Sequence, residues 1–259
     1  MSGLYALTVR KVLALSAVGS IGLGTSASGA VLINSFSNIA PAGTAGDPYD
    51  ASTTGSPILT PSSTDLVSGM TATVTYNLLA GPPGSTTQES SSGEVAWTDG
   101  SIATVYGTGH AGYGSVDGRV GGAALQTYVT FDLGAFYNIS QVDVFLGWND
   151  SGRDDSSFNL LASTDNVAFT TIASYTKGPD NTGAITTPVT NLHSITDDGG
   201  AAISSGVRYI QFEFTDADNG WAGLAEVDII GTAVPEPSSL VLLGISSLAA
   251  AGFRRRRNN

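Results

Sequence analysis

TYVTFDL at residues 127–133 and QVDVFL at residues 141–146 are the segments with the clearest strand pattern. In both segments every second residue is a branched or aromatic apolar residue. A period of two is typical of a β-strand that buries one face and leaves the other toward solvent. The two segments therefore predict two half-buried strands.

Similar short runs recur along most of the chain, whereas residues 37–68 are dominated by Ala, Pro, Gly, Ser and Thr with little periodicity. Turn-forming residues such as Asp197-Asp198-Gly199-Gly200 separate the runs. The other expected strands cover residues 31–36, 71–78, 158–161, 169–175, 185–192, 207–214 and 224–230. Because no convincing amphipathic helix interrupts them, the sequence predicts an all-β fold, an antiparallel β-sandwich.

The composition limits what the folded body can do. The chain has no cysteine, which excludes disulfides, thiolate nucleophiles and cysteine-based metal sites. Its net charge is −12, and residues 31–234 hold only four of the 10 basic residues against 21 of the 22 carboxylates. Such an acidic body repels phosphate backbones, so nucleic acid is not an expected partner, whereas divalent cations and neutral ligands are. Acidity that serves only solubility outside the cell is the alternative.

The N-terminus has the residue order of a secretory signal peptide. Arg10 and Lys11 precede the apolar run 12–23, and small residues follow up to Ala30. We expect signal peptidase to cleave after Ala30, because an apolar run of 12 residues is short for a membrane span. An uncleaved N-terminal anchor is the alternative.

The C-terminus joins three features in order, namely the triplet Pro235, Glu236 and Pro237, the apolar stretch 238–253, and the cluster Arg254, Arg255, Arg256 and Arg257. As a transmembrane helix the stretch would rise about 24 Å and would span the membrane if the arginines snorkel, with the arginines on the cytoplasmic side. This combination resembles the PEP-CTERM sorting signal. The resemblance implies processing by an exosortase near the triplet and an address at the envelope, cell surface or extracellular matrix of a Gram-negative-type bacterium. A plain tail anchor would satisfy the same physics.

The folded body resembles a second family over residues 94–231. The segments FDLG (131–134), LASTDNVAF (161–169), VRYI (207–210) and LAEVDI (224–229) follow one another as in discoidin, or F5/8 type C, domains. Those domains are galactose-binding-like jelly rolls, so the resemblance implies a jelly-roll β-sandwich here. Asn166 stands where the family's turn has glycine, and Asn tolerates the left-handed conformation.

Calcium is the cofactor that this second resemblance implies. Several members hold the ion between an Asp-Gly turn and a glutamate near the last strand, which correspond here to Asp99 and Glu226. Further oxygens would come from the segment 101–104, with Thr104 as the side-chain ligand. An oxygen-rich set of this kind suits Ca²⁺. The alternative is that Asp99 merely begins a turn and Glu226 is a solvated strand residue.

The candidate ligand site consists of polar and aromatic residues on loops. Trp148, Asn149 and Arg153 lie between two expected strands, and Trp221 lies on another loop. Sugar sites combine an aromatic plane with a few hydrogen-bonding groups, and they are built on loops at one end of a sandwich. These residues predict an extracellular polysaccharide or other glycan as ligand. A core-capping tryptophan and a surface ion pair of the arginine are the alternatives.

The chain thus divides into a signal peptide (1–30), N-terminal strands with a loop-rich segment (31–93), a discoidin-like sandwich (94–233) and a sorting tail (234–259). We expect an exported, sorted surface or matrix protein with a non-catalytic binding module, since no motif such as Gly-x-Ser-x-Gly or His-Glu-x-x-His occurs. A secreted carbohydrate-active enzyme with converging carboxylates and a purely structural matrix protein are the alternatives.

Overall fold

The structure is a computed structural model and is described for residues 29–41, 49–76, 93–104, 114–117, 119–120, 123–124, 127–148, 154–179, 187–217 and 221–235. Within these residues the regular structure is β, apart from one short 3₁₀ helix, η2, at Gly93–Trp97. The predicted all-β class is confirmed. The expected membrane helix, and the signal peptide up to residue 28, lie outside the described residues.

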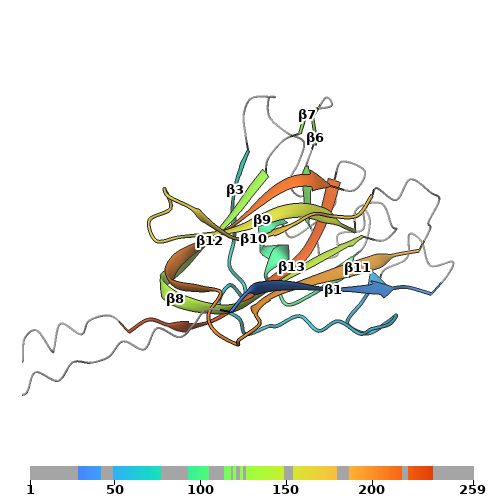
Figure 1. Ribbon diagram of the computed structural model, residues 1–259. Helices are drawn as coiled ribbons and strands as arrows, with labels where there is room; N and C mark the ends of the chain where they lie inside the picture. The colour runs from blue at the N-terminus through green and yellow to red at the C-terminus, as the bar shows by residue number, and fades with distance from the viewer. Residues whose placement is uncertain are drawn as a thin grey trace, which may run out of the picture.

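The long strand β8, Thr127–Trp148, organises the fold because it belongs to two layers (Figure 1). Its first half pairs with β3 and β12, and its second half pairs with β11 and β13. All these pairings are antiparallel, so one nine-stranded sheet folds back on itself. The two strands expected from the alternating segments are therefore the two halves of a single bent strand.

The bend in β8 lies at the FDLG segment. Gly134 has a φ of 75°, which favours glycine, and its N–H donates to Asp132 Oδ1 at 2.9 Å. The register against β12 jumps here, from Asp132 opposite Tyr209 to Tyr137 opposite Val207. A bulge of this kind bends the strand, and the bend carries the second half of β8 into the other layer.

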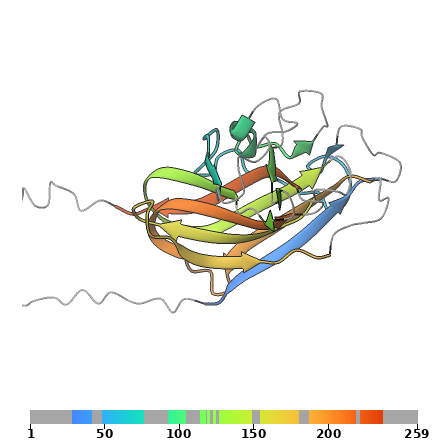
Figure 2. The ribbon, with the colours of Figure 1, turned by 90° about the horizontal axis from the view of Figure 1, so that it is seen from above.

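The two layers form a β-sandwich (Figures 1 and 2). The β12 layer has the order β3 (Thr73–Tyr76), first half of β8, β12 (Ser204–Ala217), β9 (Ser156–Ser163) and β10 (Thr170–Tyr175). The β13 layer has the order β1 (Val31–Ile39), β11 (Val189–Asp197), second half of β8, β13 (Trp221–Ala233) and β5 (Gly114–Asp117). Contacts between β1 and β10 join the layers at one edge. Two short pairs remain, β2 (Tyr49–Asp50) with β4 (Ala103–Thr104) and β6 (Arg119–Val120) with β7 (Ala123–Ala124).

The inner faces of the layers enclose one hydrophobic core. Phe131, Phe158 and Phe212 lie in it with at most 1% of their surface exposed. The ring of Phe212 meets Phe158 at a centroid distance of 5.7 Å and Phe131 at 6.4 Å, both in the edge-to-face arrangement that aromatic rings prefer. Trp97 at the end of η2 is fully buried in the same cluster, so η2 is anchored to the sandwich.

The outer face of the β13 layer is covered around Phe145 of β8 and Ala225 of β13, whereas the sequence pattern predicted a solvated face. Phe145 points outward from β8 and is nevertheless fully buried, against Tyr49, Leu59, Ile102 and Ala225. The segment 49–70, which we call the covering segment, supplies part of this second cluster. The prediction of a half-buried strand is therefore wrong for the second half of β8, because a chain segment without strand periodicity packs on it.

Asn38 ties the covering segment to β1. Its side chain is fully buried, and Nδ2 donates to the carbonyl oxygens of Ala51, Thr54 and Pro57 at 3.3, 2.9 and 2.6 Å. The hydroxyl of Tyr49 donates to Asn38 Oδ1. One amide side chain thus satisfies several backbone groups that would otherwise be buried without partners.

The strand directions place Val31 and Ala233 at one end of the sandwich. Val31 pairs with Asp197 at the end of β11, and Ala233 pairs with Tyr137 beside the bend of β8. Because neighbouring strands are antiparallel, β8 ends and β13 begins at the opposite end. We call that opposite end the loop end.

Candidate functional site

The predicted ligand loops leave the sandwich at the loop end. Trp148 is the last residue of β8 and Trp221 the first of β13, and these strands are neighbours, with Leu224 opposite Leu146. The end of β12 and the start of β9 lie at the same end of the other layer, where Ala217 pairs with Ser156. The structure therefore brings the backbones of the two tryptophans together at one end of the sandwich.

The side chains of Trp148 and Trp221, and the residues Asn149 and Arg153, lie outside the described part of the chain. Their predicted contact with a ligand remains a prediction. What the structure does describe is the base from which the loop 149–153 projects.

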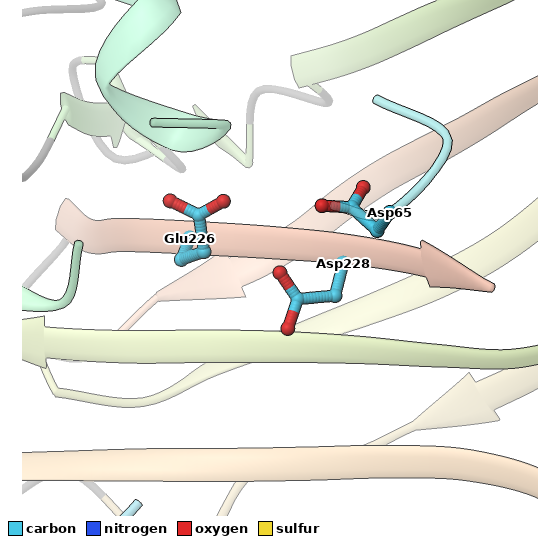
Figure 3. A group of neighbouring side chains, drawn as sticks. All are labelled: Asp65, Glu226 and Asp228. Atoms are coloured by element: carbon cyan, nitrogen blue, oxygen red, sulfur yellow. The ribbon is translucent and has the colours of Figure 1, made fainter. Parts of the chain in front are cut away.

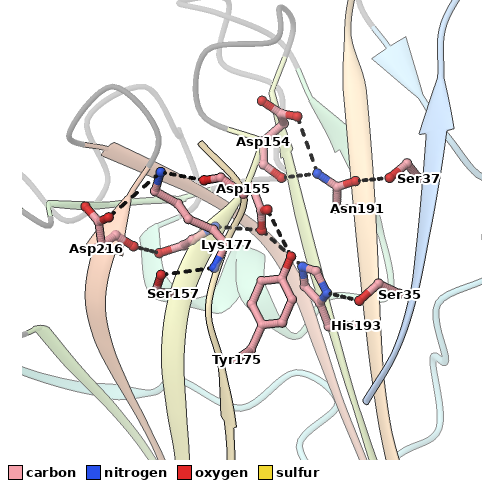
Figure 4. A network of polar contacts seen from close by, with 12 residues as sticks. Ser35, Ser37, Asp154, Asp155, Ser157, Tyr175, Lys177, Asn191, His193 and Asp216 are labelled. Atoms are coloured by element: carbon pink, nitrogen blue, oxygen red, sulfur yellow. Dashed lines mark hydrogen bonds and ion pairs between the residues drawn. The ribbon is translucent and has the colours of Figure 1, made fainter. Parts of the chain in front are cut away.

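The returning end of that loop is held by buried hydrogen bonds (Figure 4). Asn191 on β11 donates Nδ2 to the carbonyl oxygen of Asp154 at 2.7 Å and accepts a hydrogen bond from Ser37 at 2.5 Å. Asp154 and Asn191 are only 3% and 8% exposed. Hydrogen bonds shielded from water in this way hold the backbone firmly.

The next residue, Asp155, is held by a second set of contacts (Figure 4). Its Oδ2 accepts from the Tyr175 hydroxyl at 3.0 Å, and its Oδ1 lies 3.2 Å from His193 Nε2. Burial, and then the Asp155 charge, raise the pKa of Tyr175, so its hydroxyl keeps its proton and remains a donor. On the other side of the imidazole, Nδ1 lies 2.9 Å from Ser35 Oγ.

Ser35, His193 and Asp155 are the residue types of a hydrolase triad. The imidazole is only 1% exposed, and it packs against the rings of Tyr175 and Phe158 at centroid distances of 4.0 and 5.9 Å. Since the ring is enclosed by aromatic neighbours and fixed at both nitrogens, we assign these residues to the support of the loop.

A polar groove on the outer face of the β12 layer was not singled out from the sequence. Its volume is about 370 Å³. The guanidinium of Arg208 lies 5.2 Å from the ring centre of Tyr209, and it donates to both oxygens of Asp132 at 2.7 and 2.8 Å. The hydrogen bond from Arg208 lowers the pKa of Asp132. The lining residues are Thr73, Thr75, Thr130, Asp132, Asn166, Phe169, Tyr209 and Gln211.

The residues predicted to bind calcium are brought together only in part. The N–H of Gly100 donates to Glu226 Oε2 at 3.1 Å, so the Asp-Gly turn does reach the last strand. Asp99 is exposed, and its Oδ1 accepts from the N–H of Ser101 at 2.9 Å. Thr104 is fully buried on β4, and no hydrogen-bond partner for its Oγ1 is present in the described part. Glu226 is also fully buried, which excludes its alternative role as a solvated strand residue.

Two further carboxylates, those of Asp65 and Asp228, lie beside Glu226 (Figure 3). Glu226 and Asp228 are two residues apart on β13, so both point to its outer face. Asp65 comes from the covering segment. One oxygen from each of the three side chains lies within 4.8 Å of the other two, and we call this group the carboxylate cluster. The alternation of side chains along β13 could have predicted that Glu226 and Asp228 share a face. Nothing in the sequence indicated that Asp65 joins them.

Each member of the carboxylate cluster uses one oxygen to accept backbone hydrogen bonds. Asp65 Oδ1 accepts from the N–H groups of Val67 and Ile229 at 2.9 and 3.3 Å, and Asp228 Oδ2 accepts from Ser62 at 2.7 Å. The other three oxygens, Asp65 Oδ2, Glu226 Oε1 and Asp228 Oδ1, are buried and have no hydrogen-bond partner within the described ranges.

Burial and the proximity of the other carboxylates favour the protonated form of the carboxylate cluster. Burial raises the pKa of Glu226 to about 10, and the charges of Asp228, Asp99 and Asp65 act in the same direction. Burial also raises the pKa of Asp228 to about 7, with Asp65 and Asp143 contributing. No lysine or arginine of the described part forms an ion pair with the cluster, since the ion pairs there join Arg208 to Asp132, Lys177 to Asp216 and His193 to Asp155.

The C-terminal tail matches a known protein family. Residues 233–257 carry the PEP-CTERM protein-sorting motif. The match includes the triplet, the apolar stretch and all four arginines, so the predicted sorting signal is confirmed and the chain is an exported, exosortase-sorted protein. No helix within the described ranges is long and apolar enough to cross a membrane, and the stretch 238–253 lies outside them. No curated protein matches the chain.

The chain is also similar to solved carbohydrate-binding modules. The lectin domain of lectinolysin complexed with Lewis B antigen is 17% identical at a TM-score of 0.41, with 66% of this chain and 98% of that domain covered. CpGH89CBM32-5 from Clostridium perfringens, in complex with GalNAc-β-1,3-galactose, is 15% identical at a TM-score of 0.40, with 64% and 99% covered. CpGH89CBM32-6 from the same organism is 20% identical at a TM-score of 0.28, with 41% and 70% covered. The predicted sandwich of antiparallel strands is confirmed by the strand pairing of this chain itself.

Proposed function

We propose that this exported protein acts at the cell surface or in the extracellular matrix, where its sandwich binds glycan without catalysis. The proposed binding surface is the loop end, with Trp148, Asn149, Arg153 and Trp221 as the contact residues. The observation that carries the proposal is the convergence of the ends of β8 and β13 above the hydrogen-bonded base at Asp154 and Asp155.

The hydrogen bonds that hold Asp154 and Asp155 at the end of the loop favour ligand binding. Ordering a loop on binding costs free energy, and a loop already fixed at its base loses less of it. Aromatic rings that stack on sugar faces and polar groups that bond the hydroxyls are the usual components of such a site. The loop end offers both kinds of residue in the sequence.

The position of the carboxylate cluster supports binding over glycoside hydrolysis. Hydrolysis of a glycosidic bond uses two carboxyl groups that flank the substrate. Glu226 and Asp228 are 0% and 1% exposed beneath the covering segment, so a sugar ring has no access to them. We expect the protein to leave a bound oligosaccharide intact, which chromatography after overnight incubation would check.

A glycan array with the full-length chain, followed by calorimetry on the best ligand, tests the proposal. Trp148→Ala should weaken binding about 30-fold, since an aromatic residue at a binding hot spot contributes about 2 kcal/mol. Its thermal unfolding should change little, because exposed substitutions stay within about 0.5 kcal/mol. Tyr209→Ala, which alters the groove on the β12 layer, is the matched control and should bind normally.

The opposite pattern, with binding lost in the Tyr209 variant alone, would move the site to the groove and overturn the assignment to the loop end. An array without any ligand, together with a Trp148→Ala variant destabilised by about 3 kcal/mol, would contradict glycan binding and identify a core-capping tryptophan.

A further inference from the structure

The polar groove on the outer face of the β12 layer is built on three neighbouring strands. Thr130 of β8 lies opposite Thr73 of β3 on one side and opposite Gln211 of β12 on the other. Gln211 Nε2 donates to Thr130 Oγ1 at 2.9 Å, so a cross-strand hydrogen bond fixes the floor of the groove. The groove volume of about 370 Å³ falls within the range of ligand sites in proteins.

One wall of the groove is a turn that is already ordered. Asn166 and Phe169 line the groove from the turn between β9 and β10. Ser163 Oγ accepts from the N–H groups of Asp165 and Asn166 at 3.1 Å each. Asp165 Oδ1 accepts from the N–H groups two and three residues further along the chain, both at 2.9 Å. A wall held in this way loses little conformational freedom when a ligand binds.

The lining residues of the groove offer no unpaired charge to a ligand. Asp132 is the only charged residue among them, and the Arg208 guanidinium donates to both of its oxygens, at 2.7 and 2.8 Å. The other lining residues are threonines, an asparagine, a glutamine and two aromatic residues. On a strongly acidic body, such a neutral groove favours an uncharged ligand with many hydroxyl groups over an ion.

Two aromatic rings give the groove apolar surface. Tyr209 belongs to the floor and Phe169 to the wall, and both side chains are half-buried. The guanidinium of Arg208 lies 5.2 Å from the ring centre of Tyr209, where the attraction between a cation and a ring face holds the ring in place. Aromatic surface beside hydrogen-bonding side chains is the combination that sugar sites use.

We propose that this groove is a second glycan site, which holds a segment of an uncharged polysaccharide chain. The proposal rests on glycan binding by the sandwich but not on the loop end. Tyr209 lies eight residues from Ala217, where β12 reaches the loop end, and this separation is about 26 Å of extended strand. A short oligosaccharide therefore occupies one site at a time, whereas a polymer can occupy both.

Chain length decides whether the groove contributes to binding. The ring of Tyr209 is half-buried and Arg208 lies over it, so the groove alone offers a short oligosaccharide too little surface for tight binding. A polymer presents many segments at high effective concentration, which makes a weak second site count. Tyr209→Ala should therefore leave the binding of a short oligosaccharide at the loop end unchanged and weaken the binding of a polymer.

Affinity electrophoresis of the full-length chain in native gels tests the inference, with hydroxyethyl cellulose, dextran and a galactomannan as uncharged polymers and alginate as the acidic one. We expect at least one uncharged polymer to retard both the parent and Trp148→Ala, and alginate to retard neither. In the Trp148→Ala background, Tyr209→Ala or Gln211→Ala should raise the polymer concentration needed for retardation at least tenfold. Tyr128→Ala, on the same face but outside the groove, is the matched control and should have no such effect.

Several results would overturn the inference. One is equal retardation of Trp148→Ala with and without the two groove substitutions. Another is complete loss of retardation in a folded Trp148→Ala variant, which would leave the loop end as the only site. Stronger retardation by alginate, or no retardation of the parent by any uncharged polymer, would contradict it as well. Circular dichroism checks the folding of each variant, and Gln211→Ala decides if the Tyr209 variant does not fold. The two proposals fail separately, because an array without ligand contradicts the loop end whereas the gels in the Trp148→Ala background decide on the groove.

Discussion

Without a bound cation, the stability of the protein should fall as the pH rises, and Asp228 should account for much of the fall. Burial raises the pKa of Asp228 from 3.8 to about 7. Between these two values the unfolded chain has released the proton while the folded chain still holds it. The proton held in the folded state therefore stabilises the fold fully below pH 3.8, and this stabilisation is lost as the pH rises through about 7.

The size of the effect follows from the rise in pKa. At 1.36 kcal/mol per pH unit, a rise from 3.8 to about 7 corresponds to about 4 kcal/mol for Asp228 alone. A domain of this size is stable by about 5–15 kcal/mol, so the loss is a large fraction of the total. Glu226, whose pKa burial raises to about 10, acts in the same direction.

Urea unfolding in EDTA at several pH values from about 4 to about 8, followed by tryptophan fluorescence, measures the loss. Trp97 is buried in the core and reports on unfolding. The variant Asp228→Asn lacks the titrating group, so its stability should decline less steeply with pH and should exceed that of the parent at pH 8. Calcium should flatten the parent's profile in the same way. Equal slopes for parent and variant, or a parent whose stability rises relative to the variant, would refute the reasoning.

Mass spectrometry of mature protein from a host with an exosortase should find chains that lack Arg254 to Arg257. The sorting motif at residues 233–257 predicts cleavage ahead of these arginines. If every recovered chain kept its full-length C-terminus, the prediction of processing would be contradicted. Asn38→Ala should lower the free energy of unfolding by about 3 kcal/mol, because it removes the hydrogen bonds that the two N–H groups of Nδ2 donate to the covering segment and the one that Oδ1 accepts from Tyr49, at about 1 kcal/mol each. Asn38→Asp keeps the shape of the side chain but loses its N–H donors, so this variant should be destabilised as well. If the urea midpoints of both variants equalled that of the parent, Asn38 would not hold the covering segment.

Alternation along the sequence predicted the strands because each strand lines the common core on its inner face. It placed Phe131 and Val144 correctly, and both are buried between the layers. It failed on the outer face of β8, where Phe145 was expected at a solvated surface. The covering segment has no strand period, and its packing depends on contacts such as those of Asn38, which lie far away in sequence until the chain is folded.

The candidate sites also contain residues that the sequence could predict and residues that it could not. The resemblance to discoidin domains led to Glu226, and period two extends that to Asp228. Asp65 could not be found, since two hydrogen bonds that form only on folding bring it to β13: the N–H of Leu66 donates to the carbonyl oxygen of Ile229, and the N–H of Ile229 donates to Asp65 Oδ1. The tryptophans of the loop end were placed on adjacent strands by the topology, while their roles remain predictions.

The two ends of the sandwich lie a full strand length apart along β13. The sorting tail continues from β13, whose last residue is Ala233, and the loop end begins at its first residue, Trp221. Thirteen extended residues span about 40 Å. The proposed contact residues Trp148 and Trp221 therefore belong to the end of the sandwich that is farther, along β13, from the start of the sorting tail. Processing at the tail, which the sorting motif predicts, would therefore take place a full strand length from the proposed glycan-binding surface.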